Sequence, residues 1–284
     1  MGLLLLPTFK SSGMSSESTT ESASPYRHIE NMTVEEVLSC INQEDRKVAG
    51  AVALSLPQIG KLVEALCERM LAGGRLFYLG AGTSGRLGVL DASECPPTFG
   101  VPADRVVGII AGGQRALMQA VEHVEDDAGK GWKDLQEQGV SASDLVVGIS
   151  ASGTTAYVLG ALLACREHGI ATGSICCNPD SPIGRAADFP IEVIVGPEFI
   201  TGSTRMKAGT AQKMVLNMIS TAVMVRLGRV EDNKMIHLRP LNRKLLDRGA
   251  QIISKELGIS DLDECRQLLL ELGSVKEVLN SRRS

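Results

Sequence analysis

Short apolar runs alternate with longer segments of helical character between residues 75 and 227. We predict strands at 75–80, 106–111, 145–150, 172–177 and 191–195, and helices near 84–92, 114–123, 154–168 and 206–227. The runs are continuous stretches of Val and Ile rather than alternations of apolar and polar residues, which is typical of strands buried on both faces. The sequence therefore predicts an α/β fold with a doubly wound, parallel five-stranded sheet.

Helical patterns precede the predicted sheet. Thr33 and Glu36 have the spacing of a capping box, which indicates the start of a short helix reaching about residue 41. A longer helical pattern covers 43–71, and Pro57 is expected to bend or interrupt it.

The two ends of the chain differ from its middle. Residues 1–25 are rich in Ser, Thr and Glu near their end, which predicts a disordered tail or tag, or a segment ordered only by contact. Residues 241–284 carry only helical patterns. We expect one main domain over 26–240, followed by a small helical appendage.

Composition limits the partners. A net charge of −4 over 284 residues gives no reason to expect a nucleic acid. The seven cysteines lack the spacing of a metal site, and we expect buried, reduced thiols, no metal and a cytoplasmic protein. The apolar run at residues 3–6 is too short for a signal segment, so no membrane partner is expected.

Two predicted strands lead into similar loops rich in small and hydroxyl residues, one over 80–85 and one over 150–155. Backbone N–H groups, hydroxyls and the start of a helix together attract an anion. Ser and Thr are also common in ordinary turns, but two such loops in one sheet favour a phosphate site. The candidate binding residues in these loops are Gly82, Thr83, Ser84, Ser150, Ser152 and Thr154.

The first loop also matches the dinucleotide pattern G-x-G-x-x-G. That fold needs an acidic residue at the end of its second strand to hold the ribose. The second predicted strand ends in Ile110-Ala111-Gly112-Gly113, without an acid. A phosphate monoester is therefore favoured over a dinucleotide, and no cofactor is expected.

A third polar segment precedes the predicted helix at 206–227. The hydroxyls of Ser203 and Thr204 are placed to cap this helix or to bind substrate. Lys207 and Arg205 are alternative candidates to meet an anionic substrate. Lys207 lies in the first turn, where the helix dipole opposes its charge, which favours such a role over a surface role.

Two glutamates are candidates for acid–base chemistry. Glu94 precedes Pro96-Pro97, which we expect to end the helix, so its carboxylate lies where the dipole disfavours it. Glu125 belongs to an acidic run that is also consistent with a solvated helix end. Two carboxylates alone do not identify a reaction.

Long motifs at 79–88, 90–98, 195–198 and 202–213 resemble the N-acetylmuramic acid 6-phosphate etherases of the sugar isomerase (SIS) superfamily. The resemblance implies a SIS fold and a homodimer that needs no cofactor. It also implies cleavage of the D-lactyl ether of N-acetylmuramate 6-phosphate, giving N-acetylglucosamine 6-phosphate and D-lactate in cell-wall recycling.

The resemblance also assigns roles. The family's catalytic acid falls on Glu94 and its second catalytic glutamate on Glu125, which would remove the C2 proton of the ring-opened sugar. One loop departs from the family, because Thr154 and Ala156 stand where Arg and Pro are usual. Two alternatives stay open: a sugar-phosphate-binding regulator without catalysis, as in the related glucokinase regulatory protein, and a sugar-phosphate isomerase.

Overall fold

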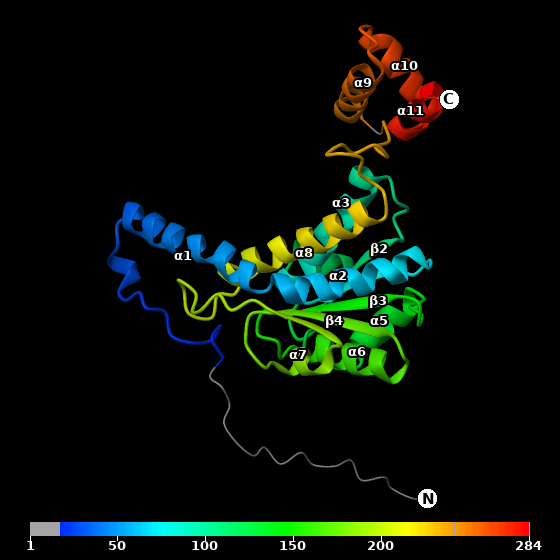
Figure 1. The fold of residues 1–284 in the computed structure, drawn as a ribbon. Helices are drawn as coiled ribbons and strands as arrows, with labels where there is room; N and C mark the ends of the chain where they lie inside the picture. The colour runs from blue at the N-terminus through cyan, green and yellow to red at the C-terminus, as the bar shows by residue number, and fades with distance from the viewer. Residues whose placement is uncertain (1–17, 241, 284) are drawn as a thin grey trace, which may run out of the picture.

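A computed structural model describes residues 18–240 and 242–283 of the chain (Figure 1). Its centre is a parallel five-stranded sheet in the order β2-β1-β3-β4-β5, which confirms the predicted fold class. The strands are β1 (Leu76–Gly80), β2 (Val106–Ile110), β3 (Leu145–Ile149), β4 (Ala171–Cys176) and β5 (Phe189–Glu192).

Helices cover both faces of the sheet. One layer contains α1 (Val34–Leu54), α2 (Leu56–Leu71), α3 (Gly82–Phe99) and α8 (Lys207–Arg226). The opposite layer contains α5 (Lys130–Glu137), α6 (Ala156–Glu167) and α7 (Pro182–Ala186). Consecutive residues of β1 alternate between the two cores: Tyr78 packs in the first and Phe77 in the second, and both are fully buried. The unbroken apolar runs follow from this two-sided burial.

Three helices at the C-terminus form a unit with a small core of its own, set apart from the sheet in Figure 1. They are α9 (Arg243–Leu257), α10 (Leu262–Leu272) and α11 (Val275–Arg283). Asp261 caps α10 by accepting hydrogen bonds from the amides of Asp263 and Glu264.

Helix boundaries near the N-terminus differ from the predicted ones. The capping box of Thr33 and Glu36 is present, after a short 3-10 helix (Ile29–Asn31), but α1 runs without a break to Leu54. The break falls at Ser55, and Pro57 lies in the first turn of α2, where its missing N–H costs nothing. In the described part of the chain no single helix is long and apolar enough to cross a membrane. Only α1 and α2 together reach that length and apolarity, and they are bent by 56° at their junction.

Two further boundaries correct the sequence analysis. The proline pair lies inside α3, which ends at Gly100 in the left-handed conformation, because burial of Cys95 and Phe99 holds the last turns against the core. The fifth strand covers 189–192 rather than 191–195. Val193 and Val195 are buried in the core beyond the paired strand, so their apolar character extended the predicted run.

The remaining differences concern short elements. Helix α4 (Gly113–Met118) is shorter than predicted, and the sequence did not indicate α5 or α7. The expected disordered tail falls mostly on residues 1–17, outside the described residues. Residues 18–25 are ordered by contact: Thr19 and Ser24 donate hydrogen bonds to the carbonyls of Cys177 and Phe199.

Candidate functional site

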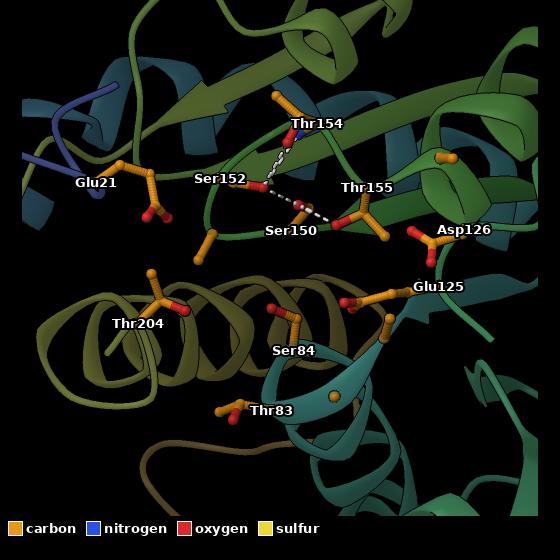
Figure 2. Close-up of a pocket in the computed structure, with 14 residues that line it drawn as sticks. Glu21, Thr83, Ser84, Glu125, Asp126, Ser150, Ser152, Thr154, Thr155 and Thr204 are labelled. Atoms are coloured by element: carbon orange, nitrogen blue, oxygen red, sulfur yellow. Dashed lines mark hydrogen bonds between the residues drawn. The ribbon is translucent and has the colours of Figure 1, made fainter. Parts of the chain in front are cut away.

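The two hydroxyl-rich loops meet at the topological switch point of the sheet, between β1 and β3, where the strand order reverses. Strand β1 pairs with β2 on one side and with β3 on the other, so the loops after β1 and β3 leave neighbouring strand ends. In open parallel sheets such a point is the usual place for a ligand. A cavity of about 440 Å³, here called the hydroxyl pocket, lies there (Figure 2). It is lined by Glu21, Ala81, Gly82, Thr83, Ser84, Glu125, Asp126, Ser150, Ala151, Ser152, Thr154, Thr155, Ala156 and Thr204.

The loop after β3 organises its hydroxyls among themselves. The oxygen of Ser150 lies 2.8 Å from that of Thr155 and 3.3 Å from that of Ser152, which in turn lies 2.9 Å from Thr154. The amide of Gly153 donates to Ser150 Oγ at 3.1 Å. Four hydroxyls are thus held together just before α6, where the helix dipole favours an anion.

The loop after β1 enters its helix almost at once, since α3 begins at Gly82. A Cβ atom on Gly85 would lie 2.6 Å from the carbonyl oxygen of Gly80, so the strand and helix approach too closely for a side chain there. Gly80 and Gly85 of the G-x-G-x-x-G match therefore serve this packing, whereas Gly82 has a positive φ of 51° and open space around it. Ser84 lines the pocket while its hydroxyl donates to Gln212 Oε1 at 2.9 Å.

Glu125 reaches the pocket from the loop between α4 and α5. Its backbone carbonyl accepts a hydrogen bond from the amide of Tyr157 in α6, which ties the loop to the helix behind the hydroxyls. In Figure 2, Glu125 and Asp126 lie at one end of the pocket and Glu21 at the other, with the hydroxyls between them.

Sequence reasoning missed Glu21, Asp126 and the support of the N-terminal segment. The side chain of Asn178 accepts from the amide of Thr20 at 3.1 Å and donates to the carbonyl of Ser152 at 3.0 Å. Asn178 thereby joins the segment carrying Glu21 to the hydroxyl loop. The Ser/Thr/Glu-rich segment has no periodic pattern that predicts this contact. Among the described residues that line the pocket, three are carboxylates and none is Lys or Arg.

Glu94 lies outside this pocket. It lines a separate cavity of about 240 Å³ between α3 and α8. Ser84 and Glu94 stand ten residues apart on α3, a separation of roughly 15 Å along a helix. Glu94 is also not in the last turn, because α3 continues to Phe99. The inference from an unfavourable helix end was therefore wrong, and one chain does not bring the two glutamates into one pocket.

The segment before α8 contributes only Thr204 to the hydroxyl pocket; Ser203 and Lys207 do not line it. The start of α8 is capped by Glu198, whose carboxylate accepts from the amides of Lys207 and Ala208 at 3.0 and 2.9 Å. The hydroxyls of Ser203 and Thr204 do not form this cap, contrary to the sequence analysis.

Lys207 is 2% exposed, and its ammonium group lies 2.5 Å from Glu44 Oε2. Burial alone would raise the pKa of Glu44, but hydrogen bonds from Lys207, Lys47 and Tyr26 outweigh it and lower the pKa to about 2. The prediction that Lys207 meets the substrate thus disagrees with its position. Its charge compensates a buried carboxylate and joins α8 to α1.

Comparisons with known proteins agree with this architecture. Residues 58–166 match the family of the glucokinase regulatory protein N-terminal SIS domain, and residues 121–222 match the SIS domain family. The chain is 57% identical over 260 residues to an N-acetylmuramic acid 6-phosphate etherase of Porphyromonas gingivalis, covering 92% of this chain and 94% of that protein. It is 56% identical over 224 residues to the protein of that name from Yersinia pestis, covering 79% and 76%.

Solved structures with the same fold are more distant in sequence. The phosphoheptose isomerase GmhA from Neisseria gonorrhoeae superposes with a TM-score of 0.52 at 17% identity, covering 67% of this chain and 98% of that one. The Vibrio vulnificus NanR protein complexed with ManNAc-6P has a TM-score of 0.50 at 14% identity, covering 69% and 65%.

Proposed function

This chain belongs to the N-acetylmuramic acid 6-phosphate etherase family, and we propose on that basis that it cleaves the D-lactyl ether of N-acetylmuramate 6-phosphate. The products are N-acetylglucosamine 6-phosphate and D-lactate. The identity of 57% over 92% of the chain carries this assignment, and the hydroxyl pocket at the β1–β3 switch point, with Glu125 at its end, supports it. The complex of the NanR protein, which shares this fold, with ManNAc-6P supports the ligand class.

The phosphate of the substrate binds at the loop after β3. Ser150, Ser152, Thr154 and Thr155 supply hydroxyl donors there, and the start of α6 adds a favourable dipole. Hydroxyls and helix amides bind a dianion without a cation in the pocket. Glu125 and Glu21 lie at the two ends of the pocket, away from the phosphate, and the sugar extends from the phosphate towards Glu125.

The reaction uses the aldehyde of the ring-opened sugar. The aldehyde makes the C2 proton acidic, and Glu125 removes it as a general base. The C3–oxygen bond then breaks, and Glu94 donates a proton to the departing lactate oxygen. Water adds to the resulting unsaturated aldehyde at C3, with Glu94 accepting one of its protons, and Glu125 returns a proton to C2. One water molecule is consumed, which balances the reaction.

Acid and base act on adjacent carbons, but the two glutamates occupy different cavities of one chain. We therefore infer a homodimer in which the Glu94 cavity of one copy faces the hydroxyl pocket of the other.

A direct assay tests the function. Purified protein is incubated with N-acetylmuramate 6-phosphate, and free D-lactate is measured with time; the expected result is one lactate for each N-acetylglucosamine 6-phosphate. Glu125→Gln serves as the matched inactive control. Tight binding of the sugar phosphate without lactate release from folded protein would instead indicate a non-catalytic sensor. Aldose–ketose interconversion without lactate would indicate an isomerase.

A further inference from the structure

The cavity that contains Glu94 combines apolar walls with charged groups of both signs. Its walls are Leu87, Leu90, Asp91, Glu94, Lys213, Leu216 and Asn217. Apolar side chains from α3 and α8 thus surround two carboxylates, one amide and one ammonium group. The volume of about 240 Å³ is enough for a small organic acid.

Lys213 is the cation of this cavity. It projects from α8 as an exposed side chain, and it forms no ion pair within 4 Å with any residue that the structure describes. Its charge lowers the pKa of Asp91, so it acts on that carboxylate through space without a direct contact. Lys213 therefore differs from Lys207, whose charge is already compensated in the interior.

Asp91 is held by groups of the fold rather than by Lys213. It is 6% exposed, and its Oδ1 accepts from Asn217 at 2.7 Å and from Ser220 at 3.1 Å. Burial raises the pKa of Asp91, although these donors, the nearby hydroxyl of Tyr78 and the charge of Lys213 oppose the rise. These donors reach Oδ1 alone, and Oδ2 is buried without a hydrogen-bond partner among the described residues. No hydrogen bond or ion pair joins Lys213 to either oxygen, so its ammonium group keeps its own donors for a ligand.

The leaving group explains why a cation belongs beside Glu94. In the lactyl ether, a single carbon separates the ether oxygen from the carboxylate. The group that protonates this oxygen, Glu94, therefore also lies close to the lactyl carboxylate. Once Glu94 has lost its proton, the two negative charges repel each other. A cation in the same cavity offsets this repulsion and holds the departing acid.

We propose that Lys213 binds the lactyl carboxylate of the substrate in the cavity that it shares with Glu94, with the lactyl methyl group against Leu87 and Leu216. This inference rests on the proposed function. The apolar walls suit the methyl group, and the ammonium group suits the carboxylate. Lys213 is thus a determinant of specificity for an ether that carries a carboxylate.

The test compares Lys213→Met and Lys213→Arg with Lys61→Met, which removes an exposed lysine from α2. Each protein is assayed on N-acetylmuramate 6-phosphate and on the analogue in which the lactyl carboxylate is a primary amide. A charged hydrogen bond of this kind changes kcat/KM by about 10- to 100-fold. We expect Lys213→Met to lose that factor on the acid but not on the amide, Lys213→Arg to regain most of it, and Lys61→Met to behave as wild type.

A second readout separates this role from a general one. Exchange of the C2 proton of N-acetylglucosamine 6-phosphate with D₂O needs the base but no lactyl group. Lys213→Met should retain this exchange within about twofold. Equal losses on acid and amide, loss of exchange, or unchanged activity on the acid would each overturn the role of Lys213. Absence of lactate release by the wild-type protein would instead overturn the proposed function.

Discussion

The amide of Tyr157 donates a hydrogen bond of 3.0 Å to the backbone carbonyl of Glu125. The loop that carries the proposed base is thereby fixed to the first turn of α6, directly beside the hydroxyls that follow β3. The same loop touches α6 again at Gly160, where an added Cβ would lie 1.9 Å from the carbonyl oxygen of Ala128. Position 160 has no room for a side chain without moving the loop.

Gly160→Ala should therefore displace Glu125 while leaving the hydroxyls in place. A misplacement of about 1 Å at a catalytic group costs up to about 100-fold in rate. We expect kcat to fall by about 10- to 100-fold and KM to change much less, as measured by lactate release. Gly50→Ala in α1 is the matched control, because a Cβ there meets nothing within 4 Å. Equal activity of the two variants would show that the contact does not position Glu125.

The two glutamates should be separable by isotope exchange. Glu125→Gln should abolish incorporation of deuterium at C2 of the sugar phosphate, because no base remains to remove the proton. Glu94→Gln should retain that exchange but release lactate at least about 100-fold more slowly, since the acid acts only when the C3–oxygen bond breaks, after the C2 proton has been removed. Mass spectrometry of the sugar in D₂O checks both, and the reverse pattern would exchange the two roles.

Mixing inactive variants tests whether a site draws on two copies. If Glu94 of one copy serves Glu125 of the other, a mixed dimer of Glu94→Gln and Glu125→Gln contains one intact site of two. Random reassembly from equal amounts should then restore about a quarter of wild-type lactate release. Each variant refolded alone is the control. If the mixture stays inactive while mixed dimers form, both glutamates belong to the same chain's site.

The buried pair of Lys207 and Glu44 should stabilise the fold rather than bind substrate. Lys207→Met leaves the Glu44 carboxylate buried without its main partner, which typically costs about 3–5 kcal/mol. Urea unfolding at neutral pH measures the loss. Lys47→Met is the control: its side chain is 59% exposed, so removal should cost less than about 1 kcal/mol. A large rise in KM without loss of stability would favour a substrate role.

The same pair predicts a dependence on pH. The pKa of Glu44 is lowered in the folded protein from 4.5 to about 2. Stability from this group is therefore complete above the unfolded-state value and is lost as the pH falls through the folded-state value. Between these pH values the wild type should lose more unfolding free energy than Glu44→Gln, which cannot titrate. Parallel losses in both proteins would remove Glu44 as the cause.

Thr154 offers a gain-of-affinity test. Its side chain is exposed at the pocket, where the described lining residues include no cation. Thr154→Arg places the guanidinium usual in the family beside the hydroxyls, and a solvent-exposed phosphate contact should lower KM by about three- to tenfold. Thr154→Gln controls for side-chain size. An unchanged KM for Thr154→Arg would indicate that the phosphate lies away from this position.

Glycine and hydroxyl residues illustrate how much of the site could be predicted. The loops after β1 and β3 were recognised because strand, small residues and helix follow one another locally, and Gly82, Thr83, Ser84, Ser150, Ser152 and Thr154 all line the pocket. Glu21 was not recognised, because its segment reaches the pocket through Asn178, which is more than 150 residues away in the chain. A contact of that kind leaves no periodic signal.

Local order along the chain thus determined the parallel sheet and the place of the two hydroxyl-rich loops, because the period of apolar residues and the turn chemistry act between near neighbours. Only the tertiary structure decided which charged side chains are paired in the interior and which remain in an open cavity. Two basic residues on the same helix, Lys207 and Lys213, look alike in sequence. Packing of α1 against α8 buries the first against Glu44, while the second stays beside Glu94 in an open cavity. Which charge is neutralised depends on what folds against it, and that is a property of the assembled molecule.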